Sequence, residues 1–157
     1  MIDFTLSDEN RLVRDTARAF VEAEILPNIR EWDAGAEVHR EIFAKMGELG
    51  FLGAPIPERY GGLGMDYISF ALLCEELERA DTAFRVVQSV HVGLNSLALL
   101  QWGTEEQRQR WLVPQAKGEK LATFGLTEPG VGTDAANLQT TARRDGDERY
   151  RWRTAFR

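Results

Sequence analysis

The helical spacing of the apolar residues, which continues from Leu12 to about Pro114 and then ends, constrains the fold of this chain more than any other feature. Between residues 12 and 25 the apolar side chains recur every three or four positions and form one stripe, which predicts an amphipathic helix. The same spacing predicts a second helix that begins near Asp33 or Glu37 and runs to Leu49, and further helices over 66–79, over 82–102 and from Thr104 to Pro114 or Lys117. The sequence therefore predicts an α-helical bundle as the first domain.

Polar residues, glycines and prolines mark where these helices begin and end. Ser7 and Asp66 are cap-type residues at helix starts, and residues 104–107 (Thr-Glu-Glu-Gln) match a capping box. Gly50 is suited to end the second helix, because glycine adopts the left-handed conformation that follows many helices. Residues 55–64 contain two prolines and three glycines, which predicts a long loop.

The segment 82–102 is apolar nearly all round its predicted helix, which is typical of a helix at the centre of a bundle or against another subunit. No apolar run approaches the ~20 residues that span a bilayer. Asp3 and Asp8 also lie where a signal peptide carries positive charge. We therefore expect a soluble, cytoplasmic chain without a membrane segment.

After Gly118 the pattern changes from helical to extended. An apolar run covers 121–126, and the segments 138–142 and 150–153, separated by a polar turn, predict a β-hairpin. A β region beginning near residue 120 has too few strands for a complete sheet, so either this domain is small and open or the chain stops early. The predicted fold class is mainly α, with a helical domain over 1–118 and the beginning of a β-sheet domain over 119–157.

The formal charge of −6 is unevenly distributed. Residues 1–80 carry 8 Lys or Arg against 16 Asp or Glu, and residues 81–157 carry 11 against 9, so the two halves are −8 and +2. An acidic helical half argues against nucleic-acid binding, which needs a concentrated basic face. The single cysteine cannot form a disulfide within the chain, which is consistent with a reducing compartment.

The residues that could carry chemistry are few. His39 and His91 lie far apart in sequence with no nucleophile beside them, so we predict structural or solvated roles for both and neither a metal site nor a catalytic triad. Residues 130–135 match the dinucleotide pattern G-x-G-x-x-G/A, but no parallel strand leads into them. This glycine-rich loop is either a tight connection between strands or, with the Thr127 and Thr133 hydroxyls, a site that approaches a phosphate or a heteroaromatic ring.

Residues 124–134 (Phe-Gly-Leu-Thr-Glu-Pro-Gly-Val-Gly-Thr-Asp) resemble the flavin-binding signature of the acyl-CoA dehydrogenases over eleven positions. Three further segments resemble that family in the same order: 57–64, 103–107 and 114–119. The resemblance covers residues 1 to about 150. It implies FAD-dependent α,β-dehydrogenation of an acyl-CoA thioester, with electron-transfer flavoprotein as the electron acceptor and a homotetramer as the complete assembly.

The same resemblance implies roles for residues of the motif. The backbone around Phe124 and Leu126 and the Thr127 hydroxyl would contact the isoalloxazine ring, and Gly132 and Thr133 would approach the pyrophosphate and the bound thioester chain. Phe124 stands where the family often has tyrosine, and Thr133 where serine is common. Both changes keep the chemical character of the site, an aromatic face and a hydroxyl.

The resemblance weakens after Tyr150, where the family continues with an Asn-Gly turn and an aromatic strand but this chain reads Arg-Trp-Arg-Thr-Ala-Phe-Arg and stops. The resemblance implies that the catalytic glutamate lies in a C-terminal helical bundle, so no glutamate among these residues is assigned as the base. We therefore expect a truncated acyl-CoA dehydrogenase that is inactive alone. The alternative is a non-catalytic binding or assembly module, or the product of a disrupted gene.

One further segment bears on the choice of substrate. Residues 78–85, followed by Ser89, resemble glutaryl-CoA dehydrogenases, which hold the distal carboxylate of a dicarboxylic substrate with an arginine and a serine. This resemblance makes Arg85, Ser89 and Glu78 candidate substrate-binding residues. Arg85 and Ser89 are four positions apart and share a helix face. A cation in the first turn of a helix opposes the helix dipole, so Arg85 should have a compensating partner. The alternative is a surface Arg85 paired with Glu78 or Asp81.

Overall fold

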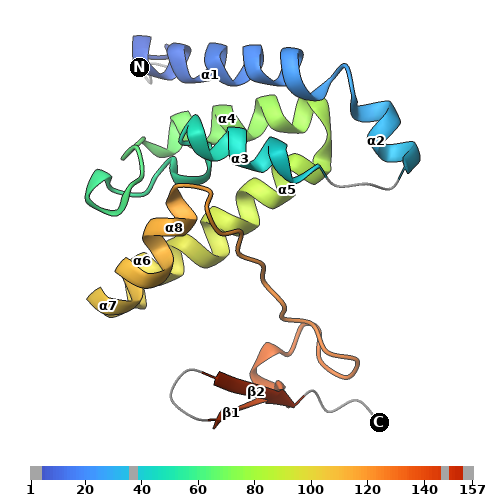
Figure 1. Ribbon diagram of the computed structural model, residues 1–157, viewed down its shortest axis with the longest axis vertical. Helices are drawn as coiled ribbons and strands as arrows, with labels where there is room; N and C mark the ends of the chain where they lie inside the picture. The colour runs from blue at the N-terminus through green and yellow to red at the C-terminus, as the bar shows by residue number, and fades with distance from the viewer. Residues whose placement is uncertain (1–4, 36–38, 146–148, 154–157) are drawn as a thin grey trace. The chain divides into compact units, whose positions relative to one another are not determined.

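The computed structural model describes residues 5–35, 39–145 and 149–153, which form two units, residues 1–124 and residues 125–157 (Figure 1). Each unit is described by itself. The first is helical, as the sequence predicts. The boundary between 118 and 119 that the sequence suggests stays a prediction.

The described helices of the first unit follow the predicted order, and several continue into wider π-helical turns (Figure 1). The helix predicted to begin near Asp33 or Glu37 and to run to Leu49 is wrong in its start, because α3 begins at Arg40 and a separate helix, α2, covers Ile29–Gly35. The elements are α1 (Asp8–Phe20) with a π turn (Val21–Ile25), α2 (Ile29–Gly35), α3 (Arg40–Glu48), short 3-10 turns (Phe51–Gly53 and Glu58–Tyr60), α4 (Tyr67–Ala80), α5 (Thr82–Ser89) with a π turn (Val90–Ser96), α6 (Leu97–Trp102), α7 (Glu105–Gln107) with a π turn (Arg108–Leu112), and α8 (Val113–Ala116).

The predicted caps at Ser7, Asp66 and Thr104 and the predicted stop at Gly50 are confirmed. Ser7 Oγ accepts from the Asn10 backbone N–H at 3.0 Å, and Asp66 Oδ1 accepts from that of Ser69 at 2.6 Å. The Thr104 hydroxyl and the Gln107 side chain form the reciprocal capping box. Gly50 follows α3 in the left-handed conformation, with φ of +73°. Local sequence therefore determines these ends, because each cap provides a partner for otherwise unpaired helix N–H groups.

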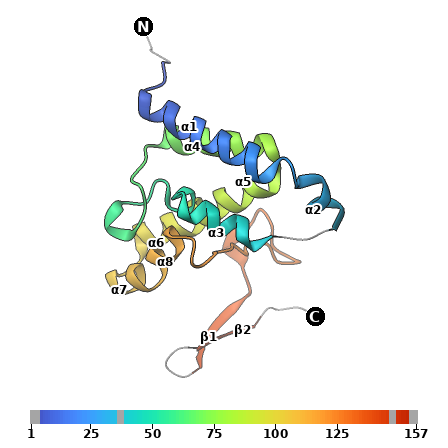
Figure 2. The same cartoon turned by 45° about the horizontal axis from the view of Figure 1, so that its top comes forward.

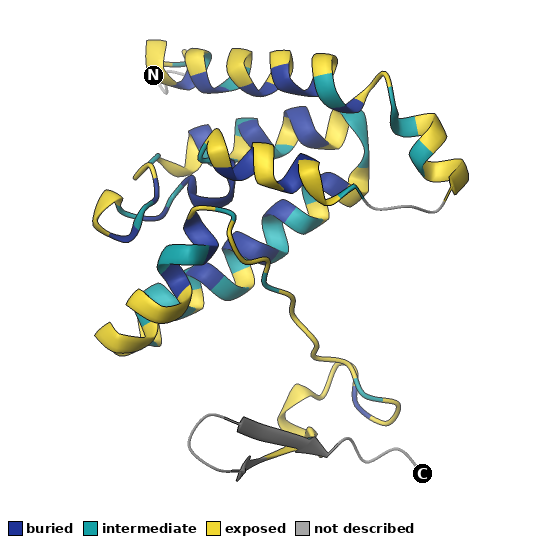
Figure 3. Cartoon of the chain, in the orientation of Figure 1, coloured by how far each residue is buried: buried dark blue, intermediate teal, exposed yellow. Residues whose placement is uncertain are grey.

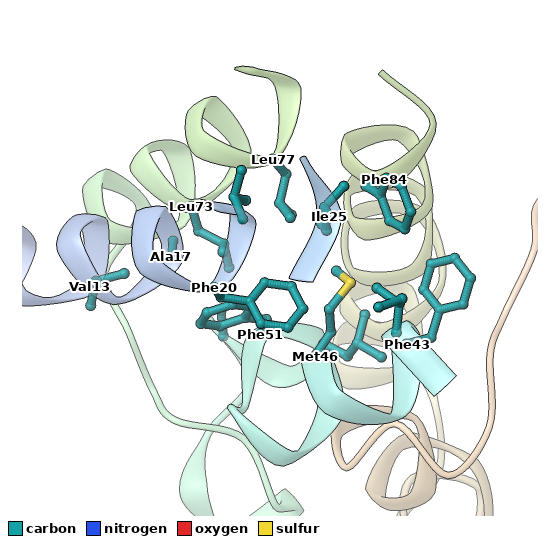
Figure 4. Close-up of a cluster of buried hydrophobic side chains, with 14 residues drawn as sticks. Val13, Ala17, Phe20, Ile25, Phe43, Met46, Phe51, Leu73, Leu77 and Phe84 are labelled. Carbon is teal, nitrogen blue, oxygen red and sulfur yellow. The ribbon is translucent and has the colours of Figure 1, made fainter. Parts of the chain in front are cut away.

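A cluster of buried apolar side chains joins α1, α3, α4 and α5 (Figures 3 and 4). Phe20 meets Phe51 edge to face with ring centroids 5.6 Å apart, and Phe43 lies 5.9 Å from Phe84. Both views in Figures 1 and 2 show α1 lying along α4. The full cluster is Val13, Ala17, Phe20, Val21, Ile25, Ile42, Phe43, Met46, Phe51, Leu52, Ala54, Leu73, Leu77 and Phe84.

One carboxylate is buried beside this core. The Glu76 side chain is 3% exposed, and it accepts from Arg18 Nη2 at 2.6 Å and from Arg79 Nε at 3.0 Å. The hydrogen bond from Arg18 is the main reason that the pKa of Glu76 is lowered, and the Arg79 bond adds to it. The ionised carboxylate thus links α1 to α4.

The helical stretch Thr82–Trp102 has 21 residues, and an 18-residue window of it has a mean hydropathy of 1.2, so by length and composition it could cross a membrane. In this structure 28% of that window is buried. The expectation that no apolar run approaches that length is therefore wrong for this helix. A core helix of a soluble domain has the same length and composition. Gln88, His91 and Ser96 are buried here and hydrogen-bonded to neighbouring segments, as in such a core. The outer side exposes Val86 and Leu94.

The second unit contains a 3-10 turn (Ala135–Asn137) and an antiparallel hairpin of β1 (Thr141–Asp145) and β2 (Arg149–Arg153). Thr141 lies opposite Arg153. The hairpin is confirmed, although its first strand begins three residues later than predicted. The expected β structure near residue 120 is wrong, because residues 121–127 have no regular secondary structure.

The buried ion pairs of Glu76 give a test of stability. We expect Glu76→Gln to lower the free energy of unfolding by about 1–3 kcal/mol, since it removes a buried charge from two arginines. Glu24→Gln is the control, because Glu24 pairs with Lys45 at the surface. This substitution should lower the free energy of unfolding by less than ~1 kcal/mol. Urea denaturation measures both.

The lowered pKa of Glu76 also predicts a pH dependence. Its contribution to stability is fully present above the pKa of an unfolded glutamate and is lost as the pH falls through the lower folded pKa. The wild type should therefore lose more stability than Glu76→Gln on acidification from about pH 5 to pH 3. Parallel losses in the two proteins would contradict a stabilising role for the ionised carboxylate.

Candidate functional site

The glycine-rich loop of residues 128–140 is closed by a single glutamate. Glu128 and Val131 exchange two backbone hydrogen bonds of 3.0 Å, which form a tight turn. The Glu128 carboxylate then accepts from the backbone N–H groups of Gln139 at 2.9 Å and Thr140 at 2.7 Å. The side-chain hydrogen bond from Thr140 and then these two backbone bonds, that from Gln139 first, hold the pKa of Glu128 below its ordinary value. The ionised carboxylate therefore fixes both ends of the loop.

The glycines of this region leave open space where a side chain would be. A Cβ at Gly125, Gly130 or Gly132 would meet no heavy atom within 4 Å, and none of the three has the positive φ that favours glycine. The described part of the chain therefore gives neither a packing reason nor a backbone reason for glycine at these positions. A bound group that approaches the backbone closely would be a reason for glycine at these positions, because any side chain would block that approach.

Two other glycines, by contrast, are required by packing. A Cβ at Gly118 would lie 2.7 Å from Gly47 Cα, and Gly118 also has φ of +75°. A Cβ at Gly47 would lie 2.6 Å from the Lys117 carbonyl oxygen. The backbones of α3 and of the turn after α8 therefore cross in direct contact, which fixes where the chain leaves the helices.

The motif residues named by the sequence are accessible. Phe124 is 48% exposed and Leu126 is 39% exposed. Thr127, Gly132 and Thr133 are exposed as well, and neither threonine hydroxyl has a hydrogen-bond partner within the described ranges. Phe124 ends the first unit and the other four belong to the second. Their side chains and amides are thus available to a ligand.

Arg85 has the compensating partner expected from its place in the first turn of α5. Its Nε donates to Glu78 Oε2 at 2.6 Å, and the Thr82 hydroxyl donates to Glu78 Oε1 at 2.8 Å. The bond from Arg85 is the main cause of the lowered pKa of Glu78. Ser89 instead donates its hydroxyl to the Val86 carbonyl at 3.2 Å. The pairing considered as the alternative to carboxylate binding is therefore present in this structure.

His91 has a connection that the sequence analysis missed. The ring is fully buried, as a structural role predicts, but it also bonds to Gln115 and to the backbone of Ala122, two residues before the motif begins. The sequence did contain a signal for such contacts. The otherwise apolar helix carries the polar residues Gln88, His91 and Ser96, all three of which are buried. Within residues 5–35, 39–145 and 149–153, no group of three or more His, Cys, Asp or Glu side chains could hold a metal ion.

Comparison with known proteins identifies relatives of this chain. The family described as "Acyl-CoA dehydrogenase, N-terminal domain" matches residues 7–119. A probable acyl-CoA dehydrogenase of Bacillus subtilis is 43% identical over 147 residues, which cover 94% of this chain and 39% of that protein. The chain therefore spans about two fifths of the length of this relative.

Two solved structures share the fold of the chain. Butyryl-CoA dehydrogenase from Megasphaera elsdenii aligns with a TM-score of 0.86 and 37% identity, covering 95% of this chain and 40% of that one. A glutaryl-CoA dehydrogenase from Mycobacterium smegmatis aligns with a TM-score of 0.84 and 40% identity, covering 91% and 37%. Both likenesses extend over more of the chain than the helical unit alone.

The two kinds of glycine give a matched test of stability. Gly118→Ala should lower the free energy of unfolding by more than about 1–2 kcal/mol, because it combines a left-handed backbone with a backbone clash. Gly132→Ala should leave stability within about 1 kcal/mol of the wild type, since its site is open. Thermal unfolding of both variants measures the difference, and a large loss in Gly132→Ala would show that the loop itself needs that glycine.

Proposed function

The chain belongs to the acyl-CoA dehydrogenase family, and from this membership we propose that it forms the helical part and one wall of the flavin site of an FAD-dependent enzyme that oxidises acyl-CoA thioesters. The observation that carries the proposal is the open glycine-rich loop. Its glycines leave room beside the backbone, and its two threonine hydroxyls are exposed. A flat ring and a pyrophosphate need this combination of close approach and free donors.

Each motif residue has a proposed task. Thr127 would donate its hydroxyl to the isoalloxazine ring, and the backbone around Phe124 and Leu126 would contact that ring. Gly132 and Thr133 would approach the pyrophosphate and the thioester chain. FAD, when bound, accepts the hydride that leaves the β-carbon of the substrate.

The proton at the α-carbon requires a base, and Glu128 is poorly suited to that task. Its carboxylate already accepts two backbone hydrogen bonds that stabilise the ionised form, which makes it a weak base. We propose that the base is a glutamate outside residues 1–157, and that electron-transfer flavoprotein then reoxidises the flavin. The apolar outer side of the helix 82–102, which includes Val86 and Leu94, would be covered in a homotetramer.

The test of the flavin site compares two glycines that are both open in the structure. The variants are made in the protein expressed from its own complete gene, called the native gene product below. There, Gly132→Val should weaken FAD retention by at least about tenfold, or ~1.4 kcal/mol, because the new side chain fills the space beside the backbone. Gly93→Val is the control, since Gly93 is equally open but lies in the helix outside the motif. Visible absorbance after gel filtration measures bound FAD.

Two results would count against this proposal. Equal FAD retention in Gly132→Val and wild type would remove the loop from the flavin site. Turnover of butyryl-CoA or glutaryl-CoA by the 157-residue chain alone, measured with an artificial electron acceptor, would show that no external base is needed. We expect no such turnover.

We infer a dicarboxylic acyl-CoA as the second candidate substrate, from Arg85 and Ser89 on one face of α5. If Arg85 binds a distal carboxylate, Arg85→Ala removes a charge-assisted hydrogen bond of roughly 1.5–3 kcal/mol, or about 10- to 150-fold in kcat/KM for glutaryl-CoA. Butyryl-CoA, which lacks that carboxylate, should be much less affected. Glu78→Gln is the control, because it weakens the ion pair but keeps the guanidinium.

Steady-state kinetics of the native gene product with both substrates decide between the two roles of Arg85. A selective loss for glutaryl-CoA supports carboxylate binding. Equal losses for the two substrates would mean that Arg85 serves only the start of the helix, through its pair with Glu78.

A further inference from the structure

His91 is fully buried in the π turn Val90–Ser96, and each of its ring nitrogens has one hydrogen-bond partner. Nε2 lies 3.0 Å from the Gln115 carbonyl oxygen, and Nδ1 lies 3.0 Å from the Ala122 backbone nitrogen. The Ser96 hydroxyl donates to Gln115 Oε1 at 3.1 Å and so holds the same residue of α8 in place. The imidazole therefore bridges α8 and the segment that follows it.

The two partners determine where the ring carries its proton. A carbonyl oxygen can only accept, so Nε2–H must donate to Gln115. A backbone N–H can only donate, so Nδ1 must be unprotonated to accept from Ala122. The ring is thus the neutral Nε2–H tautomer, and burial, which lowers the pKa of His91, favours that neutral form.

The segment that His91 holds has few other hydrogen bonds to the helices, although Leu121 lines a pocket together with Arg40 and Phe43 of α3. Residues 121–127 have no regular secondary structure. Among the described residues, the Ala122 N–H to His91 is the one hydrogen bond made by any residue from 121 to 127. Upstream, Glu119 and Lys120 bond to the Pro114 carbonyl. The imidazole is therefore the hydrogen-bonding partner that ties Ala122, two residues before Phe124, to the helices.

We propose that His91 is a positioning residue for the flavin-binding motif, which it fixes at Ala122 through the acceptor lone pair of Nδ1. The fixing of Ala122 is independent of the proposed function, whereas its role in holding flavin rests on it. The consequence is that the donor side of the ring, toward Gln115, matters less for the motif than the acceptor side.

Two amide substitutions separate the two sides of the ring. His91→Asn places an amide oxygen near the position of Nδ1 and keeps an acceptor for Ala122. His91→Gln reaches the position of Nε2 and keeps a donor for Gln115. We expect hydrogen exchange of the Ala122 amide in the 157-residue chain to accelerate at least tenfold in His91→Gln and to change little in His91→Asn. His39→Gln is the control for loss of a histidine elsewhere.

FAD retention by the native gene product is the second measurement. We expect retention to fall severalfold in His91→Gln and to be preserved in His91→Asn. Unchanged Ala122 exchange in His91→Gln would overturn the proposal, and so would faster exchange with equal FAD retention in both variants. If the wild-type protein retains no FAD, the proposed function fails instead, and the exchange data alone decide whether His91 fixes Ala122.

The wild-type ring provides a test that needs no folded variant. The chain has two histidines, so nitrogen-15 spectra contain two imidazoles, and the His39→Gln spectrum assigns them. The proposal requires the neutral Nε2–H tautomer at His91. A protonated Nδ1 at neutral pH would overturn it, because Ala122 would then have no acceptor.

Discussion

Burying Gln88, His91 and Ser96 along one helix requires the rest of the helical unit to supply a partner for each of them, because an unpaired buried polar group is costly. Gln88 Nε2 donates to the Phe51 carbonyl at 2.5 Å, and the other two side chains bond to Gln115. These partners come from a 3-10 turn before the helix and from α8 after it. The helix 82–102 thereby fixes the 3-10 turn Phe51–Gly53 and α8 through hydrogen bonds, which are directional, as well as through apolar packing, which is not. Among the described residues, Gln88 Oε1 is the one buried side-chain oxygen or nitrogen left without a hydrogen-bond partner.

Local features of the fold were predictable from the sequence, because they depend on near neighbours. Ser7, Asp66 and Thr104 cap the helices that follow them, and Gly50 ends α3. The π turns were not predictable, and Val90–Ser96 is an example. Such a turn inserts an additional residue into the helical repeat, which a search for a 3.6-residue period treats as a continuous helix.

The site was predictable in part for a similar reason. The eleven-residue motif is contiguous, so its resemblance to a known signature was visible, and the pairing of Arg85 with Glu78 lay within a range that helical geometry makes plausible. His91 and Ala122 are 31 positions apart, and no periodic pattern connects a helix to a segment without regular structure. The open space beside Gly132 likewise required coordinates.

The crossing of Gly47 and Gly118 brings together backbones that are far apart in the sequence of the helical unit. Moving the chain at Gly118 would separate it from α3, whose Phe43 and Met46 belong to the central apolar cluster. Local opening of this exit from the helices would therefore disturb a helix of the core, and it should cost more free energy than opening a surface loop. The segment without regular secondary structure that follows Gly118 thus starts from a backbone held against the core.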